Sequence, residues 1–376
     1  MIPNALQVFS ISQRPTVSGS LPDGTVVSSN SARYHRAHSG DTSGWHLLSG
    51  RLPGTVRHDT GNAMNAVFAH LPVMLEQITD VFSDMNDGVF LDATLGGAGH
   101  STAILTAHPN VSLLGIDQDD MALESAEQVL AAAGCSGRVA LRRARFDAAA
   151  LIAAKEGISA LSGALFDLGV SSPQFDVAER GFSYRFDAPL DMRMDQSTGI
   201  SAVEVVNNYS HEELTRIIRE YGEEKFASRI AARIIDARKV APVTSTIALA
   251  QIVKESIPAA TRRTGGNPAK RTFQALRIYV NNEIDVLERA IPAALELLAV
   301  SGRMVVLSYH SLEDRIVKRA FAEVSTSEVP HGLPVEPAPT RYQLLTRSSE
   351  SASPVEIESN PRAQSVRIRA IERRAA

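Results

Sequence analysis

The stretch Leu91-Asp-Ala-Thr-Leu-Gly-Gly-Ala-Gly-His-Ser101, followed by a helix-length segment and then by Leu113-Leu-Gly-Ile-Asp117, decides the fold. It reads as a strand, a glycine-rich turn, a helix and a second strand that ends in an acid. Gly96, Gly97 and Gly99 let the backbone pass close to a ligand, and Asp117 lies where a carboxylate accepts hydrogen bonds from a ribose diol. The stretch therefore predicts a site for a nucleotide-containing cofactor, although a plain turn without a ligand also fits it.

The charge beside this turn favours one class of cofactor. Asp92 lies just before the glycines, at the end of the first strand. A dinucleotide would bring an anionic pyrophosphate to the turn, whereas S-adenosylmethionine brings an ammonium and a sulfonium group. A unit-charge pair at ~4 Å is worth about 4 kcal/mol at an intermediate dielectric constant, attractive for the ammonium and repulsive for a phosphate. The glycine spacing also departs from the G-x-G-x-x-G pattern of dinucleotide sites, so we expect S-adenosylmethionine rather than NAD.

Composition and charge exclude several other classes of protein. The chain has 376 residues, of which 44% are hydrophobic and 21% charged, as in an ordinary soluble globular protein. Its net charge of -4 gives no global basic field, so any contact with RNA would depend on local patches. The single cysteine, Cys135, excludes internal disulfides and a cysteine-based zinc cluster, and favours the cytoplasm. No apolar run is long enough to span a membrane.

The first half of the chain contains two regions of different character. Residues 1–63 are rich in Ser and Gly and lack periodicity, which predicts a disordered N-terminal extension. Met64, just before the organised sequence, is an alternative start, so we expect the extension to be dispensable. From there to residue 175 strands and helices alternate, which predicts a doubly wound parallel sheet. The predicted strands are Val89–Thr94, Ser112–Asp117, Val139–Phe146 and Ala164–Leu168. The predicted helices are Gly99–Ala107, Met121–Ala133 and Ala148–Glu156.

The second half interrupts this alternation and then resumes it. Residues 176–270 are helical and loop-rich, with a capping box at Ser210-His-Glu-Glu213, and predict an inserted helical domain. Over residues 271–376 we expect five elements in order: one long amphipathic helix from Phe273 to Ile291 with a kink near Pro292, a strand at Arg303–Tyr309, a helix capped by Ser311-Leu-Glu-Asp314, and terminal strands near Tyr342–Thr346 and Ser365–Ala370.

Several side chains are candidates for chemistry at the carboxyl edge of the sheet. Asp167-Leu-Gly-Val-Ser-Ser-Pro-Gln174 leaves the fourth strand there, and Asp167 could orient an acceptor amine or hold the amino group of the cofactor. A capped strand end explains this loop equally well. Phe146 is expected beside the adenine, where its ring would stack, or in the core. His310 ends the fifth strand on the same rim, where it either contacts the substrate or has a structural role, and its neighbours do not have the spacing of metal ligands.

Two further segments are ambiguous. Pro189-Leu-Asp-Met-Arg-Met-Asp195 alternates charged and apolar residues, so it is either a half-buried, strand-like segment with paired charges or a loop over the cofactor. In the second case Asp191 and Arg193 would help to hold a substrate nucleotide. The basic run from Arg262 to Arg271 could contact phosphates or lie on a solvated surface.

Together these segments resemble the small-subunit ribosomal RNA cytosine-N4 methyltransferases, historically called MraW. The resemblance runs from about residue 70 to 373. It is carried by His70-Leu-Pro-Val-Met74, Asp92-Ala-Thr-Leu-Gly-Gly-Ala-Gly-His100, Asp167-Leu-Gly-Val-Ser-Ser-Pro-Gln174, Glu179-Arg-Gly-Phe-Ser183, Pro189-Leu-Asp-Met-Arg-Met-Asp195, Tyr221-Gly-Glu-Glu-Lys-Phe-Ala227, Arg271-Thr-Phe-Gln-Ala-Leu-Arg277, Ser308-Tyr-His-Ser-Leu-Glu-Asp-Arg-Ile-Val-Lys318 and Asn360-Pro-Arg362.

This resemblance implies a Rossmann-like class I methyltransferase domain made of residues 64–175 and 271–376, with a substrate-recognition domain inserted at 176–270. Its substrate would be one cytidine in the decoding region of 16S ribosomal RNA, and its partner the small ribosomal subunit, without a metal or a membrane. No residue is assigned to the chemical step. The implied S-adenosylmethionine ligands are Ala98, Gly99, His100, Asp117, Phe146, Asp167 and Gln174.

The sequence departs from the family pattern in the turn, and two other functions remain open. Ala98 replaces the glycine that is usual in the family's turn, and adds one methyl group there. The same fold and cofactor could also serve a protein or small-molecule acceptor. A non-catalytic ribosome-assembly factor could likewise retain the fold, although a pure binder would not need Asp92, Asp117 and Asp167 intact.

Overall fold

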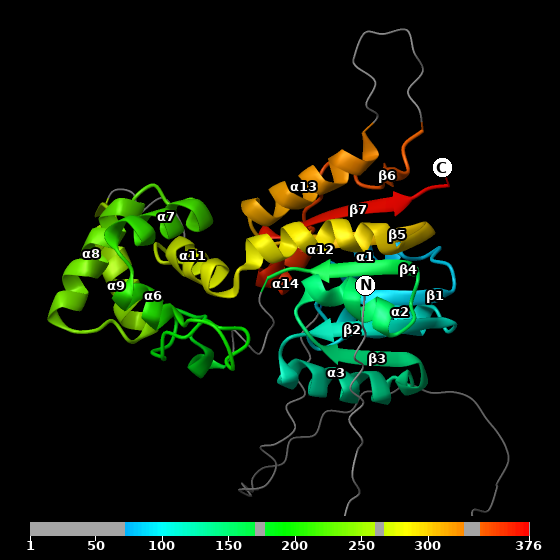
Figure 1. Cartoon of the computed structure of the whole chain (residues 1–376), viewed down its shortest axis with the longest axis horizontal. Helices are drawn as coiled ribbons and strands as arrows, with labels where there is room; N and C mark the ends of the chain where they lie inside the picture. The colour runs from blue at the N-terminus through cyan, green and yellow to red at the C-terminus, as the bar shows by residue number, and fades with distance from the viewer. Residues whose placement is uncertain (1–71, 170–176, 260–266, 327–338, 376) are drawn as a thin grey trace, which may run out of the picture. The chain divides into compact units, whose positions relative to one another are not determined.

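One sheet of seven strands organises the described part of the chain, in the order β3-β2-β1-β4-β5-β7-β6 (Figure 1). The computed structural model describes residues 72–169, 177–259, 267–326 and 339–375. β1 to β5 are parallel, β7 is antiparallel to β5, and β6 is antiparallel to β7. The strands are β1 (Gly88–Asp92), β2 (Val111–Asp117), β3 (Val139–Arg143), β4 (Leu161–Asp167), β5 (Leu298–Ser308), β6 (Tyr342–Leu344) and β7 (Arg367–Arg373).

This order confirms the predicted doubly wound α/β fold. The chain moves outward from β1 to β2 and β3, then returns to pair β4 with the other side of β1. The carboxyl ends of β1 and β4 therefore border the crevice in which such sheets bind ligands. The two predicted terminal strands are also present, as β6 and β7.

Helices cover both faces of the sheet, which explains why its strands are apolar almost throughout. Consecutive strand residues point to opposite faces: Phe90 and Leu113 lie in one core cluster, and Leu91 and Leu114 lie in the other. Neither face is left to water, so no polar alternation is needed. The first cluster is covered by α1 (Leu75–Val81), α2 (Gly99–Ala107) and α3 (Asp120–Ala132), and the second by α4 (Ala149–Lys155), α12 (Glu283–Leu297) and α13 (Ser311–Ser325).

A third core cluster is built from helices outside the sheet. Leu214, Ile230, Leu249 and Phe273 are buried in it. These helices are α6 (Ala202–Asn208), α7 (His211–Gly222), α8 (Ala227–Val240), α9 (Thr246–Ser256) and α11 (Lys270–Asn281), while α14 (Pro354–Ser359) precedes β7. The capping box predicted at residues 210–213 begins α7. Among the described residues no helix has the length and apolarity that a membrane crossing requires.

The single long helix predicted from Phe273 to Ile291 is wrong. Two helices, α11 and α12, meet at Asn282, whose φ of 52° and ψ of 37° are left-handed. Asparagine tolerates this conformation better than most residues. The apolar stripe misled the prediction because its first half packs in the third cluster and its second half packs on the sheet. Pro292, where the kink was expected, lies inside α12.

Candidate active site

Three carboxylates end three adjacent strands and meet at one edge of the sheet. Asp92 ends β1, Asp117 ends β2 and Asp167 ends β4. β1 lies between the other two strands, and all three run in the same direction. The glycine turn after β1 leads into α2 at this edge, as the sequence predicted. The site is therefore an acidic rim around a turn that exposes its backbone.

Hydrogen bonds fix the glycine turn to the end of β2. The Gly96 N–H donates to Asp117 Oδ2 at 2.9 Å, and the Asp119 N–H donates to Oδ1 at 2.9 Å. Ala98 is fully buried in a left-handed conformation, with φ 57° and ψ 24°, directly before α2. A Cβ added at Gly97 would meet no atom within 4 Å, whereas one at Gly99 would overlap the ring of Pro72. Gly97 thus leaves open space, while Gly99 is needed for packing.

Asp92 is an acid buried next to this turn. It is 2% exposed, and its carboxylate accepts the Ser101 hydroxyl at 2.6 Å and the Thr94 N–H at 3.2 Å. Burial raises the pKa of Asp92 to about 6, with a smaller contribution in the same direction from Asp167, although Ser101 and His100 lower it. Burial also raises the pKa of Asp117 in spite of its backbone hydrogen bonds. Burial of these two acids therefore makes their negative charge costly at the rim.

Asp167 forms a polar group with Tyr309 and His100. The Tyr309 hydroxyl donates to Asp167 Oδ1 at 2.8 Å, and His100 Nδ1 lies 3.8 Å from Oδ2. His100 Nε2 lies 2.9 Å from the Val73 carbonyl oxygen, which only accepts, so this nitrogen carries the proton. Burial, and then Asp167 itself, raise the pKa of Tyr309 well above 10, so its hydroxyl stays a donor. Tyr309 therefore orients the Asp167 carboxylate through one oxygen, and the side chain remains partly exposed.

Phe146, a predicted cofactor ligand, lies in a different element from the one expected. Phe146 does not end β3, which stops at Arg143, but begins a 3-10 helix at Phe146–Ala148. The pairing of Arg145 with Asp147, at 2.8 Å, holds this turn, which strand patterning could not reveal. The half-buried Phe146 ring meets Phe166 edge to face, with centroids 6.0 Å apart. Gln174 lies outside the described residues.

The segment Pro189–Asp195 packs in the third cluster and reaches the end of β3, where Arg143 pairs with Asp195 at 3.4 Å. Leu190, Met192 and Met194 are buried, and the alternating Asp191 and Arg193 form a bidentate pair at 2.8 and 2.9 Å. Asn281 accepts the Met194 N–H at 2.7 Å and donates to the Met192 carbonyl at 2.8 Å. The segment is thus a loop fixed by side chains rather than a regular strand, since its isolated β-bridge in the described chain is at Pro189.

Arg180 is a functional candidate that sequence reasoning missed. Its guanidinium donates to Asp119 Oδ2 and to the Met194 carbonyl, both at 2.8 Å. It therefore ties the loop to the turn after β2, within two residues of Asp117. The available signal was its place in Glu179-Arg-Gly, one of the segments that carry the resemblance. That motif names the residue but does not reveal its partner.

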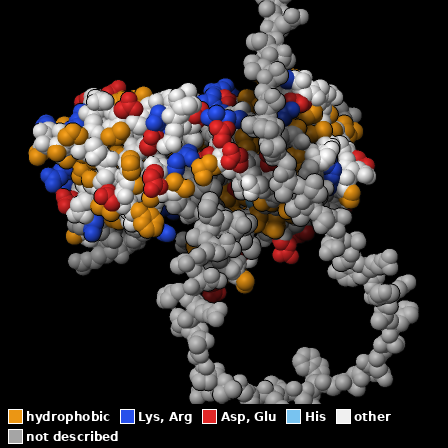
Figure 2. Space-filling model, turned by 90° about the horizontal axis from the view of Figure 1, so that it is seen from below, with side chains coloured by type: hydrophobic (Ala, Val, Ile, Leu, Met, Phe, Trp, Pro, Cys, Tyr) orange, Lys and Arg blue, Asp and Glu red, His pale blue; other side chains and the backbone are white. Residues whose placement is uncertain are grey.

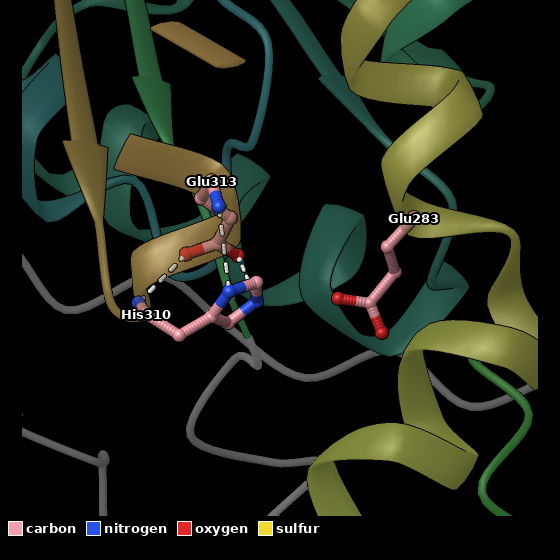
Figure 3. A group of neighbouring side chains, drawn as sticks. All are labelled: Glu283, His310 and Glu313. Atoms are coloured by element: carbon pink, nitrogen blue, oxygen red, sulfur yellow. Dashed lines mark hydrogen bonds and ion pairs between the residues drawn. The ribbon is translucent and has the colours of Figure 1, made fainter. Parts of the chain in front are cut away.

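His310 has a structural role that the sequence misassigned to Ser311. His310 is the N-cap of α13: its Nδ1 accepts the Glu313 N–H at 3.4 Å, while Glu313 accepts the His310 N–H at 3.2 Å. The Ser311 hydroxyl instead donates to Glu223, the residue after α7. Serine and threonine are the usual caps, which explains the error. Figure 3 shows the His310 ring folded over the Glu313 carboxylate.

The described structure thus has the sheet, the glycine turn and the strand-end acids of an α/β enzyme that binds a nucleotide-containing cofactor. Its sequence matches the MraW methylase family over residues 67–374, and the chain belongs to that family. A protein of Parafrankia sp. called ribosomal RNA small subunit methyltransferase H is 54% identical over 82% of this chain and 95% of its own. Proteins of the same name from Salinispora tropica and Thermobifida fusca are 54% and 53% identical, over 81% of this chain and 84% and 93% of theirs.

Proposed function

We propose that this methylase transfers a methyl group from S-adenosylmethionine to the N4 amine of a cytidine in the decoding region of 16S ribosomal RNA. The observation that carries the proposal is the acidic rim of Asp92, Asp117 and Asp167 around an open glycine turn. The curated relatives, named for a ribosomal RNA of the small subunit, support the substrate class. The small ribosomal subunit would be the partner, and the cytoplasm the location.

The rim fits this cofactor better than a dinucleotide. Asp117 offers oxygens to a ribose diol, and Gly97 leaves room for backbone contact. Asp92 and Asp167 place negative charge where an ammonium and a sulfonium would be stabilised and a pyrophosphate repelled. Ala98, Gly99, His100, Phe146 and Gln174 are the further proposed contacts. When bound, S-adenosylmethionine supplies an electrophilic methyl group.

Replacing Gly97 with alanine should separate cofactor binding from folding. The added methyl group points into open space, so we expect Tm to change by less than about 2 °C. In the complex that space is occupied, so Kd for S-adenosylmethionine should rise at least about tenfold. Gly99→Ala is the matched control, because its methyl group meets Pro72 and should lower Tm instead. Unchanged affinity in Gly97→Ala would place the cofactor elsewhere.

The affinity for S-adenosylmethionine should fall as the pH drops below about 6, the pKa of Asp92. Protonation removes the charge that attracts the ammonium, so Kd measured by calorimetry should be about tenfold higher at pH 5 than at pH 7. Asp167, whose pKa burial also raises, acts in the same direction. Titration of Asp92 does not itself destabilise the fold at low pH, since a buried acid with a raised pKa contributes stability at low pH that is lost as the pH rises. Asp92→Asn should flatten this pH dependence, and an unaltered profile would exclude Asp92.

Methyl transfer to an aromatic amine requires orientation more than a strong base. The lone pair of the cytosine amine is delocalised into the ring, and the amine is neutral at pH 7. An acceptor that holds one N–H directs the nitrogen towards the methyl group. Asp167 is our candidate, because it ends β4 at the rim and is itself held by Tyr309. The remaining proton would leave late, to water or to a rim carboxylate.

The helices that pack around the third core cluster are our candidate for the region that recognises RNA. We propose a substrate-recognition domain inserted at about 176–270, although α11, beyond that boundary, contributes buried residues to the same cluster. Acidic and basic side chains are interspersed on the face shown in Figure 2, so RNA affinity would come from local groups. Arg229 and Arg233 of α8 are exposed and suited to phosphates. Asp191 and Arg193 lie in the loop that Arg180 ties to Asp119, after β2. A splayed-out cytidine could then reach the site.

The decisive experiment incubates the full chain with methyl-labelled S-adenosylmethionine and small ribosomal subunits that lack the modification. Digestion to nucleosides should yield labelled N4-methylated cytidine, and a parallel reaction with free 16S ribosomal RNA would show whether assembly is required. Label in protein or in a small molecule would favour the alternative acceptors. Tight subunit binding without any transfer would support an assembly factor instead.

A further inference from the structure

Four charged or titratable side chains lie together behind the rim. Arg277 of α11 donates from Nε and Nη2 to the two oxygens of Glu283, at 2.8 and 2.7 Å. Its Nη2 also lies 3.9 Å from Glu313 Oε1, and His310 Nε2 lies 3.1 Å from the same oxygen. Arg277 comes from α11, whereas the other three side chains, drawn in Figure 3, come from the start of α12 and the start of α13. The group therefore joins the third core cluster to the sheet.

The internal arginine explains this group better than a metal ion does. Ligand atoms of Glu283, His310 and Glu313 lie within 4.8 Å of one another, as a cation site would require. However, the guanidinium of Arg277 already occupies both oxygens of Glu283. Burial alone would raise the pKa of Glu313, but His310 and Arg277 hold it below the ordinary value. Glu313 is thus a buried carboxylate whose charged form is favoured by His310 and Arg277 of its own chain.

Glu313 also fixes the backbone that carries Tyr309. Its Oε2 accepts the Tyr309 N–H at 2.7 Å and the His310 N–H at 3.2 Å. The Tyr309 hydroxyl in turn donates to Asp167. The end of β5 therefore cannot shift without breaking a charge-assisted hydrogen bond, which is stronger than a neutral one. Loss of the Glu313 charge would release the residue that orients Asp167.

The same network reaches the loop of the third cluster. Arg277 and Asn281 lie one helical turn apart on α11, so they share a face. Asn281 holds the backbone of Met192 and Met194, in the loop that contains Asp191 and Arg193. A continuous set of contacts thus runs from this loop through α11 and Glu313 to Tyr309 and Asp167.

We propose that Glu313 is a positioning residue for methyl transfer, which acts through Tyr309 to hold Asp167 in place relative to the Pro189–Asp195 segment anchored on α11. The inference rests on the proposed function. It assigns to Glu313 no contact with substrate or cofactor. Its effect should therefore appear in kcat rather than in the affinity for S-adenosylmethionine.

A double-mutant cycle between Glu313→Gln and Tyr309→Phe tests this pathway. Each single substitution should lower kcat by about 30-fold, with Kd for the cofactor changed by less than about threefold. Because both substitutions act on Asp167 through one route, kcat of the double variant should be about 30-fold to 100-fold below that of the parent protein. Independent effects would multiply to about 1000-fold, and that result would overturn the proposal.

Asp314→Asn is the matched control on the same helix. Asp314 is the next residue of α13, and it pairs with Arg369 of β7 at 2.7 and 3.2 Å without contacting Tyr309. This variant should keep kcat within about threefold of the parent. If Glu313→Gln does not fold, Glu313→Asp replaces it, since it keeps the charge but shortens the side chain. Its kcat should fall, and its effect should be non-additive with that of Tyr309→Phe in the same double-mutant cycle. An equal loss in Asp314→Asn would reduce Glu313 to a merely structural residue.

A spectroscopic measurement keeps the inference separate from the reaction. With tyrosine labelled at Cζ with ¹³C, the Tyr309 resonance, assigned by its absence in Tyr309→Phe, reports the hydrogen bond to Asp167. It should move in Glu313→Gln and stay in place in Asp314→Asn. A parent protein that methylates nothing would refute the proposed function, while this shift would still test the coupling. An unmoved Tyr309 resonance in Glu313→Gln would overturn the coupling itself.

Discussion

Replacing Asp167 with alanine should lower kcat for methyl transfer by about 100-fold at saturating S-adenosylmethionine. The variant loses the oxygen that we propose holds the acceptor N–H, so the amine is no longer directed at the methyl group. It also leaves the Tyr309 hydroxyl without its acceptor. Single-turnover transfer to small subunits measures the chemical step, and calorimetry measures Kd for the cofactor in the same preparation.

Two variants sharpen this result. Asp167→Asn keeps an acceptor oxygen in a side chain of the same size, so it should retain more activity than alanine. Tyr309→Phe leaves the carboxylate intact and removes only the group that orients it, so its loss should also be smaller. If Asp167→Ala turned over normally with normal cofactor affinity, Asp167 would have no part in the reaction. A rise in Kd without a fall in kcat would assign Asp167 to cofactor binding alone.

Replacing Asp117 with alanine should weaken the binding of S-adenosylmethionine by about 100-fold. Two hydrogen bonds from a ribose diol to a carboxylate account for about 3 kcal/mol, which corresponds to this factor. The substitution also frees the Gly96 N–H from its acceptor, so the turn itself loosens. Calorimetry with the cofactor and with its demethylated product gives both affinities, and both should fall, since they share the ribose.

Asp120→Ala provides the control for charge at this end of the sheet. Asp120 is an exposed acid at the start of α3, where it pairs with Arg143 at 3.2 Å and contacts no part of the glycine turn. Its removal should leave Kd within about threefold. Equal weakening in both variants would mean that Asp117 contributes only to the general field. Unaltered Kd in Asp117→Ala would move the ribose away from β2.

Local patterns predicted the sheet and the acidic rim. The helix at Gly99–Ala107 agrees with the prediction at both ends, because glycine marks its start and the apolar run its length. Asp92, Asp117 and Asp167 could be placed together because parallel strands bring their carboxyl ends to one edge. The third strand was predicted too long, since the turn at Phe146 depends on a pair between Arg145 and Asp147.

Contacts between distant residues could not be predicted in this way. The break at Asn282 follows from two helices that pack in different clusters, and neither half of the stripe reveals it. The pairing of Arg180 with Asp119 spans 61 residues, and that of Glu223 with Ser311 spans 88. Resemblance to a family can name such residues. Only the three-dimensional structure shows what they touch.

The left-handed backbone of Ala98 has a consequence for ligand capture. An alanine in this conformation is disfavoured by about 1–2 kcal/mol, yet its methyl group is fully buried against the sheet, which offsets part of that strain. Packing of this methyl group therefore favours the left-handed turn in the free protein. Association then loses little backbone freedom, so more of the contact energy appears as affinity.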